Sequence, residues 1–186
     1  MSGSIDLLRH GDTGQTSYRG QLDDPLTPLG WDQLRAATAG RRWDGIVSSP
    51  LCRCANFARE LASAQNVPLR VDSRLAEYNF GQWQGVSIAQ LAQEHGDALG
   101  RFWADPVSHP PPGAESFATF RDRLLAALHD VAEAASVSRM LVLTHGGAIR
   151  LLRCEFEGRA FGEMANLDVP HASLHRLGAL PGRASA

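Results

Sequence analysis

The sequence contains no lysine, so arginine supplies all eighteen of its permanently cationic side chains. Genomic codon bias explains this most simply, but it has a chemical consequence. Any phosphate-binding site must use guanidinium groups, whose planar geometry suits bidentate contacts. The net charge is −2, so no overall basic field attracts nucleic acid or an anionic membrane. We therefore expect neither nucleic acid nor a membrane among the partners.

Cysteines and long apolar runs are also scarce. Three cysteines, an odd number, argue against a disulfide framework, and Cys52 and Cys54 lack neighbours at zinc-ligand spacing. No apolar run approaches the roughly 20 residues that cross a bilayer, and the sequence shows no secretion signal. These absences predict a cytoplasmic protein that uses no metal and no cofactor.

The remaining composition is that of an ordinary globular protein, with 44% hydrophobic and 20% charged residues. A chain of 186 residues is long enough to enclose a core and is most simply one domain. We expect this domain to span residues 1–186, with 181–186 as a loose tail.

Apolar stretches of strand length alternate with segments at helical spacing. Strands are predicted at 5–9, 45–48, 69–71, 139–144 and 172–177. Helices are predicted at 28–39, 50–64, 87–94, 97–103, from 116 onward, and at 146–156. Thr27–Pro28 and Ser49–Pro50 each read as an N-cap followed by proline at the first helical position. Residues 139–144 are the most apolar and should form a central strand, whereas 172–177 alternates like an edge strand.

Two of the predicted strands end on a histidine followed by glycine. The first leads into Arg9, His10 and Gly11, and the other leads into His145 and Gly146. A single histidine is by default a core or surface residue of no chemical importance. Two strand ends that deliver histidines to one sheet edge favour a functional site, because open α/β sheets bind ligands at that edge.

Two further segments, Ser48–Arg53 and Leu75–Gly81, add an arginine and a glutamate. In order and spacing the four motifs resemble those of the histidine phosphatase superfamily, and the resemblance extends from Ile5 to about Arg153. It implies the phosphoglycerate-mutase-like fold, an α/β/α three-layer sandwich around a mostly parallel central sheet. A narrower similarity, to the α-ribazole phosphatases of cobalamin biosynthesis, rests on segments that recur in other small phosphatases of the superfamily. These segments are Pro25–Gly30, Glu77–Gly85, Pro112–Ser116 and Thr144–Arg150.

The resemblance makes His10 the nucleophile. A neutral imidazole attacks phosphorus near pH 7 without a metal, and we expect a carbonyl near Gly11 to hold its other ring nitrogen. Positive charge around the phosphoryl oxygens would come from Arg9, Arg53 and His145, aided by peptide N–H groups after Gly146. Arg53 falls in the first turn of its helix, where a cation is unfavourable unless an anion binds nearby.

Glu77 is the predicted general acid for the leaving group, with Asp12 as the rival carboxylate. Thr16 stands where many members of the superfamily carry asparagine. Its hydroxyl should donate to a phosphoryl oxygen, with altered affinity or substrate preference. The aromatic residues that follow Glu77 suit a packed flap or a recognition surface equally well, and the loop 14–25 should lie over the site.

Three functions are compatible with these residues. The first is a phosphomonoesterase acting on a small-molecule phosphate ester, either α-ribazole 5′-phosphate or another metabolite such as phosphoserine, phosphoglycerate or a sugar phosphate. The second is a phosphoglycerate-mutase-type isomerase, for which the segment between Glu77 and Pro112 is short. The third is a phosphate-binding module without activity, disfavoured because every catalytic residue type is present. The chain is expected to be a monomer or a homodimer.

Overall fold

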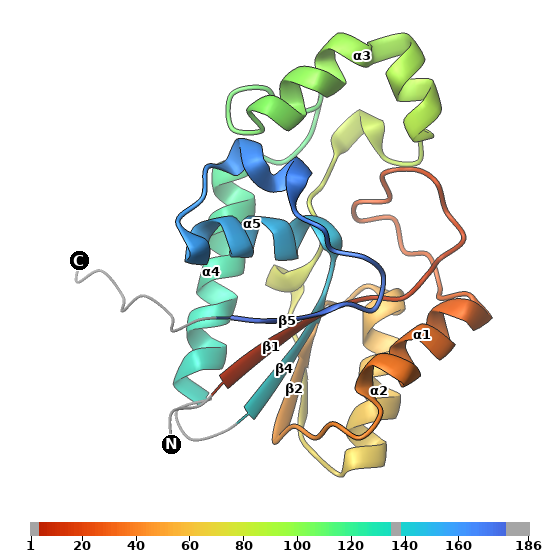
Figure 1. Ribbon diagram of the computed structural model, residues 1–186, viewed down its shortest axis with the longest axis vertical. Coiled ribbons are helices and arrows are strands. Elements are labelled where there is room, and N and C mark those ends of the chain that lie inside the picture. Colours follow the sequence, from red (N-terminus) through yellow and green to blue (C-terminus); the bar gives the residue numbers. More distant parts are fainter. Residues whose placement is uncertain (1–3, 135–138, 178–186) are drawn as a thin grey trace.

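A five-stranded sheet runs through the centre of the computed structural model, which describes residues 4–134 and 139–177 (Figure 1). Its strand order is β3-β2-β4-β1-β5. Four strands are parallel to one another: β1 (Ser4–Arg9), β2 (Gly45–Ser48), β3 (Leu69–Val71) and β4 (Arg139–Thr144). The edge strand β5 (Leu174–Arg176) is antiparallel to β1. The predicted mostly parallel sheet is confirmed, with the most apolar strand, β4, at its centre.

Helices cover both faces of this sheet. The helices are α1 (Pro28–Thr38), α2 (Cys52–Gln65), α3 (Ile88–Ala104), α4 (Phe117–Ala134) and α5 (Gly146–Glu157). Short 3₁₀ turns are η1 (Ser73–Leu75), η2 (Gly81–Trp83) and η3 (Phe161–Asn166). In Figure 1, α1 and α2 lie on one side of the sheet, α4 and α5 on the other, and α3 at one end. The expected three-layer sandwich is therefore present.

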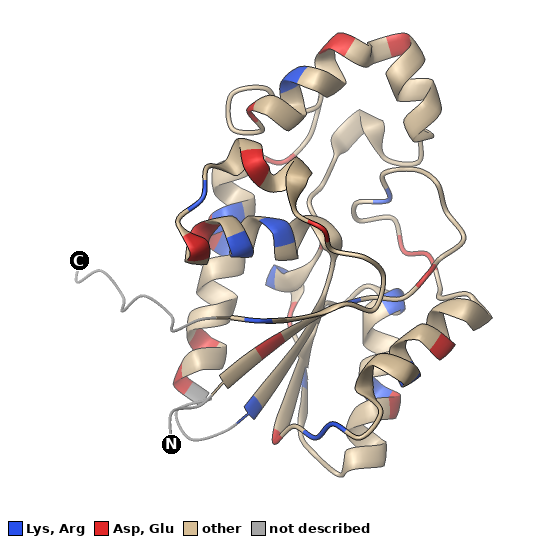
Figure 2. Ribbon diagram, in the orientation of Figure 1, with Lys and Arg blue, Asp and Glu red and all other residues tan. Residues whose placement is uncertain are grey.

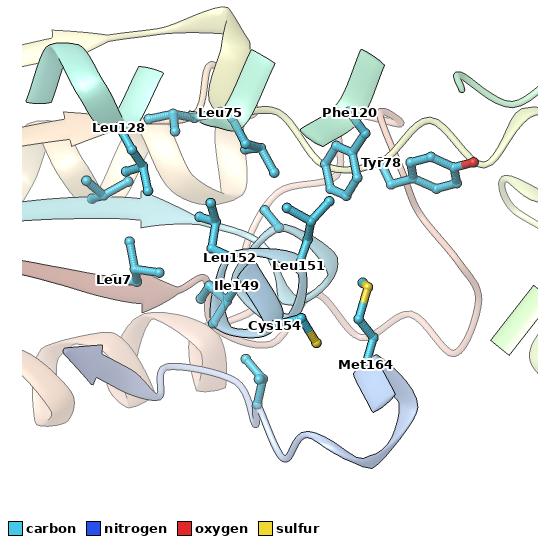
Figure 3. Packing of buried hydrophobic residues seen from close by; sticks show 14 of the residues in the cluster. Leu7, Leu75, Tyr78, Phe120, Leu128, Ile149, Leu151, Leu152, Cys154 and Met164 are labelled. Carbon is cyan, nitrogen blue, oxygen red and sulfur yellow. The ribbon is translucent and has the colours of Figure 1, made fainter. Parts of the chain in front are cut away.

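Successive residues of the central strands supply two separate cores, which explains their continuous apolar sequence. Leu7 of β1 and Val142 of β4 pack with α4 and α5, whereas their neighbours Leu8 and Leu141 pack with α1 and α2. Figure 3 shows Leu7 facing the apolar side of α5. A strand buried on both faces is held rigidly, and the rigid ends of β1 and β4 carry the predicted site.

The sequence predicted two helix N-caps, and the structure contains one of them. Thr27 caps α1 as predicted, with its hydroxyl accepting from the Gly30 N–H at 3.1 Å. The Ser49–Pro50 cap is wrong, because α2 begins at Cys52 and Leu51 occupies its N-cap without a side-chain bond. The Ser49 hydroxyl instead contacts a ring nitrogen of His145 at 2.7 Å. The same hydroxyl accepts from the Leu51 N–H at 3.3 Å, so Ser49 links the residue before α2 to the histidine of the site.

Other predictions concern element boundaries. The two helices predicted at 87–94 and 97–103 are present as the two parts of α3, separated by a kink at His95, whose φ and ψ of −137° and 29° are not helical. The edge strand is shorter than predicted, and the sequence did not predict η3. The tail expected at 181–186 lies outside the described residues.

Charges of both signs are interspersed along the helices (Figure 2). Among the described helices, none is long and apolar enough to span a membrane.

A close backbone contact fixes the loop after β1, and it supports a stability prediction. A Cβ on Gly11 would lie 2.1 Å from the carbonyl oxygen of Gly30 in α1. Gly11→Ala should therefore lower the free energy of unfolding by about 1–3 kcal/mol, measured by urea denaturation. The matched control is Gly100→Ala in exposed α3, where no atom lies within 4 Å of the added carbon. It should raise stability by roughly 0.5–1 kcal/mol. An unchanged free energy of unfolding in Gly11→Ala would show that the loop and α1 can move apart to admit a Cβ without cost.

Candidate active site

The two strand-end histidines lie next to each other because of the register between β1 and β4. Arg9 pairs with Thr144, and the His10 N–H donates to the Thr144 carbonyl at 3.1 Å. The following residues, His10 and His145, are therefore neighbours at the carboxyl edge of the sheet, with ring centroids 5.3 Å apart. Both are buried, His145 completely.

One cavity of about 230 Å³ opens at this edge. Six of the seven predicted site residues line it: Arg9, His10, Thr16, Arg53, Glu77 and Gly146. The seventh, His145, lies behind the lining against His10. The structure thus brings together residues from β1, α2, α5 and two loops, although their catalytic roles remain predictions.

His10 is held in one tautomer by its own backbone neighbour. Its Nδ1 lies 2.8 Å from the Gly11 carbonyl oxygen, which can only accept a hydrogen bond. Nδ1 must therefore carry the proton, so Nε2 of the neutral ring is left with a free lone pair. Burial, together with the nearby cations Arg53 and Arg9, holds the pKa of His10 well below its usual value. The ring is consequently neutral near pH 7, as a nucleophile requires.

Among the arginines that line the cavity, Arg19 pairs with Asp24 at 2.7 Å, whereas Arg9 and Arg53 lack carboxylate partners, unlike most arginines of the described chain. Burial lowers the pKa of Arg9 to about 10; its NH1 donates to the Val169 carbonyl, and its buried Nε has no partner. Arg53 is only 1% exposed and donates to the carbonyls of Gly20 and Leu22 at 2.7 and 2.6 Å. Neither makes an ion pair with any described carboxylate. Uncompensated buried cations of this kind favour an anionic ligand.

His145 is fully engaged by the protein around it. One ring nitrogen contacts the Ser49 hydroxyl at 2.7 Å, and the other accepts from Arg53 Nε at 3.3 Å. Burial and the charge of Arg53 hold the pKa of His145 well below its ordinary value. The imidazole is therefore neutral in the free site, and the predicted cationic donor can form only when a bound dianion offsets these effects.

Glu77 is fixed at the amino end of α5. Its carboxylate accepts from the N–H groups of Gly147 at 2.9 Å, Ala148 at 3.1 Å and Tyr78 at 2.9 Å. A Cβ at position 147 would lie 2.6 Å from Glu77 Oε1, so a larger residue there would displace the carboxylate. The guanidinium of Arg123 also donates to the Glu77 carbonyl at 2.9 Å, an anchor that the sequence did not reveal. The carboxylate is thus held at the cavity wall by the backbone.

Asp12, the rival carboxylate, is placed differently. It does not line the cavity, and its Oδ2 accepts from the Thr27 hydroxyl at 2.7 Å and the Gly14 N–H at 3.0 Å. These bonds tie the loop after β1 to the start of α1. The geometry therefore favours Glu77 over Asp12 as the group that faces a substrate.

Three charged or imidazole side chains that line the cavity, those of Arg19, Arg150 and His171, were not among the site residues predicted from the sequence. Arg150 of α5 lines the cavity, and no described carboxylate pairs with it. His171 lies with its ring centroid 5.5 Å from that of His10. A signal for His171 was available: the amino end of an antiparallel edge strand lies at the same sheet edge as the carboxyl ends of parallel strands. His171 comes just before β5 and therefore reaches this edge.

The aromatic residues after Glu77 form a packed flap. Tyr78, Phe80 and Trp83 are all buried in the core between the sheet, α3 and α4. The cavity wall is aromatic where Tyr18 stacks on Phe80, with centroids 4.7 Å apart. Trp103 Nε1 donates to the Tyr18 hydroxyl at 2.8 Å, which joins α3 to the predicted covering loop 14–25.

Two mycobacterial proteins are similar to this chain in sequence. The glucosyl-3-phosphoglycerate phosphatase of Mycolicibacterium vanbaalenii is 35% identical over 166 residues, which are 82% of this chain and 73% of that protein. The bifunctional protein Rv2228c of Mycobacterium tuberculosis is 35% identical over 153 residues, or 78% of this chain, but the match spans only 42% of its length.

Solved structures show the same fold. The mycobacterial glucosyl-3-phosphoglycerate phosphatase Rv2419c, in complex with VO₃, aligns with a TM-score of 0.85 at 27% identity, over 95% of this chain and 91% of that one. The α-ribazole phosphatase of Shigella flexneri aligns with a TM-score of 0.79 at 24% identity, over 93% and 89%. Residues 5–185 match the sequence profile of the histidine phosphatase superfamily (branch 1), and the chain therefore belongs to that superfamily.

Proposed function

We propose that this chain is a metal-independent phosphomonoesterase that acts on a small phosphorylated metabolite through a phosphohistidine at His10. The observation that carries this proposal is the environment of the His10 ring. Its Nδ1 is held by the Gly11 carbonyl, so the unprotonated Nε2 is the nitrogen available for attack. The guanidinium groups of Arg9 and Arg53 border the same cavity without carboxylate partners. Such a site stabilises negative charge on a transferring phosphoryl group.

In the first half-reaction, the lone pair on His10 Nε2 attacks phosphorus and the bond from phosphorus to the ester oxygen breaks. The departing oxygen takes a proton from Glu77, which leaves the substrate as a free alcohol. Arg9 and Arg53 bind the phosphoryl oxygens, whereas the N–H groups of Gly147 and Ala148 at the start of α5 donate to Glu77, contrary to the sequence prediction that they assist. The role of Glu77 requires it to be protonated when the substrate binds, although its carboxyl group accepts three backbone N–H bonds in the free site.

In the second half-reaction, water attacks the phosphohistidine from the side that the alcohol has left. One proton of that water goes to Glu77, and the bond between phosphorus and Nε2 breaks. Inorganic phosphate is released, and the protonated Glu77 and neutral His10 are ready for another cycle. Transfer back to a second substrate hydroxyl would make the protein a mutase, so access of water decides between the two outcomes.

Substrate choice rests on the rest of the cavity. The aromatic wall at Tyr18 and Trp103 suits a planar leaving group, and α-ribazole 5′-phosphate is one substrate with such a group. Arg150 adds a third guanidinium without a described carboxylate partner, which suits a substrate with a second acidic group. Phosphoglycerate-type and phosphoserine-type esters have that chemistry.

A panel of phosphate esters, assayed by phosphate release with and without EDTA, tests this function. We expect inorganic phosphate from at least one class, at a rate that the chelator leaves unchanged. The panel should compare α-ribazole 5′-phosphate with phosphoserine, 3-phosphoglycerate and a neutral sugar phosphate. Activity that EDTA removes and a divalent metal restores would contradict the metal-independent mechanism. Interconversion of phosphoglycerates without phosphate release would instead favour a mutase.

A further inference from the structure

His171 lies against the nucleophile, although no part of the mechanism above uses it. Its ring centroid is 5.5 Å from that of His10, nearly the same separation as between His10 and His145. Unlike His145, it lines the cavity, and its side chain is 29% exposed. His145 has both ring nitrogens in hydrogen bonds to the protein. His171 is therefore the imidazole beside His10 that faces the cavity directly.

The backbone holds His171 in this place through contacts with the end of β1. The Ala172 N–H donates to the His10 carbonyl at 3.1 Å, and the Arg9 N–H donates to the Ser173 carbonyl at 3.1 Å. Arg9 NH1 also donates to the Val169 carbonyl at 2.6 Å. Hydrogen bonds before and after His171 therefore connect its turn to Arg9 and His10.

This turn contains a strained residue. Ala172 has a φ of 56°, in the left-handed region that residues with a Cβ rarely adopt. Such conformations persist where the surrounding structure enforces them, and they are concentrated at functional sites. Here the strained residue directly follows His171.

The charged groups around His171 are suited to an imidazole that meets an anion. Its Nδ1 faces the Asp12 carboxylate, with Oδ1 at 3.9 Å, so Nε2 is the ring nitrogen left for a ligand. Burial lowers the pKa of His171, as does the charge of Arg9, while Asp12 opposes them. With Nδ1–H facing the Asp12 carboxylate, Nε2 carries a proton only in the cationic ring, and a bound phosphoryl dianion favours that form.

The position beside His10 also restricts which oxygen His171 can reach. In an in-line displacement the nucleophile and the leaving oxygen lie on opposite sides of phosphorus. A ring packed against the nucleophile therefore meets the equatorial oxygens and not the leaving one. This separates His171 from Glu77, whose proposed task is at the leaving oxygen.

We propose that His171 is a further catalytic residue, whose Nε2–H donates to an equatorial oxygen of the phosphoryl group while His10 attacks. This inference rests on the proposed phosphohistidine function. Loss of the His171 side chain should therefore weaken phosphate binding and lower kcat/KM by the same factor for every substrate. Loss of a proton donor would instead lower kcat/KM most for substrates with poor leaving groups.

Substitution at 171 tests this role. His171→Ala should lower kcat/KM by about 10²-fold for p-nitrophenyl phosphate and for an alkyl phosphate alike, as loss of one transition-state donor does. His171→Gln, which retains a donor near Nε2, should recover part of the loss. The matched control is His175→Ala, a half-buried histidine four residues along the same segment that does not line the cavity. It should retain wild-type activity.

Binding of inorganic phosphate, measured by calorimetry, gives a readout that needs no turnover. His171→Ala should weaken this binding by about tenfold, and a variant that binds phosphate as tightly as the wild type would overturn the proposal. A loss confined to alkyl phosphates would also overturn it, because His171 would then be a proton donor. If His171→Ala does not fold, the same two measurements on His171→Phe, which fills the space without a donor, decide. Wild-type protein that binds phosphate but hydrolyses no ester would refute the proposed function while leaving the phosphate contact testable.

Discussion

His10→Ala is expected to abolish phosphate release, with kcat for p-nitrophenyl phosphate falling by at least about 10⁴-fold. The substitution removes Nε2, the atom that becomes bonded to phosphorus, and the proposed mechanism assigns this attack to no other side chain of the cavity. The remaining guanidinium groups should still bind phosphate. The expected signature is therefore a protein that retains inorganic phosphate binding by calorimetry and has lost turnover.

The control for this prediction is His109→Ala. His109 is exposed and remote from the cavity lining, so its loss should leave kcat unchanged. Since the His10 ring is buried, thermal unfolding of both variants should accompany the assays. A folded His10→Ala protein with wild-type turnover would show that the nucleophile is another group.

Glu77→Gln should produce the second large effect, and its size should depend on the leaving group. A poor leaving group such as an alkoxide needs a proton as it departs, so kcat/KM for an alkyl phosphate should fall by about 10²–10⁴-fold. p-Nitrophenolate departs without protonation, so its ester should lose far less. The measurement is kcat/KM across a series of phosphate esters, plotted against the pKa of the leaving alcohol.

Asp12→Asn is the matched comparison, because Asp12 is the other carboxylate near His10 in sequence. It should affect good and poor leaving groups in equal proportion. A steep leaving-group dependence in Asp12→Asn, with none in Glu77→Gln, would transfer the role of general acid to Asp12. Equal slowing of both ester classes in Glu77→Gln would remove that role from Glu77.

Sequence patterns predicted the parts of this protein that depend on local periodicity. The alternation of apolar strands with helices is enough to predict the sheet, and β4 is central because its residues are apolar on both faces. The same patterns predicted that His10 and His145 would meet, since both follow strands that end at one edge. These inferences use short stretches of chain, whose physical preferences are readable without the rest of the fold.

Features that depend on contacts between distant segments were not predictable in this way. Ser49 looks like a helix cap in sequence, but its hydroxyl contacts His145, almost a hundred residues away. His171 approaches His10 through a turn whose geometry depends on bonds to β1. Arg53 donates to the carbonyls of a loop with no periodic pattern. In each case the decisive partner lies in another segment.

Rapid quenching during turnover is the most direct test of the central claim. The wild-type protein is mixed with excess substrate, stopped in alkali, which preserves phosphohistidine, and mapped by peptide mass spectrometry. We predict a phosphoryl group on Nε2 of His10 that forms before phosphate appears and is absent from His10→Ala. Turnover in which no protein-bound phosphoryl group accumulates, even in Glu77→Gln, or a label on any residue other than His10, would contradict the mechanism.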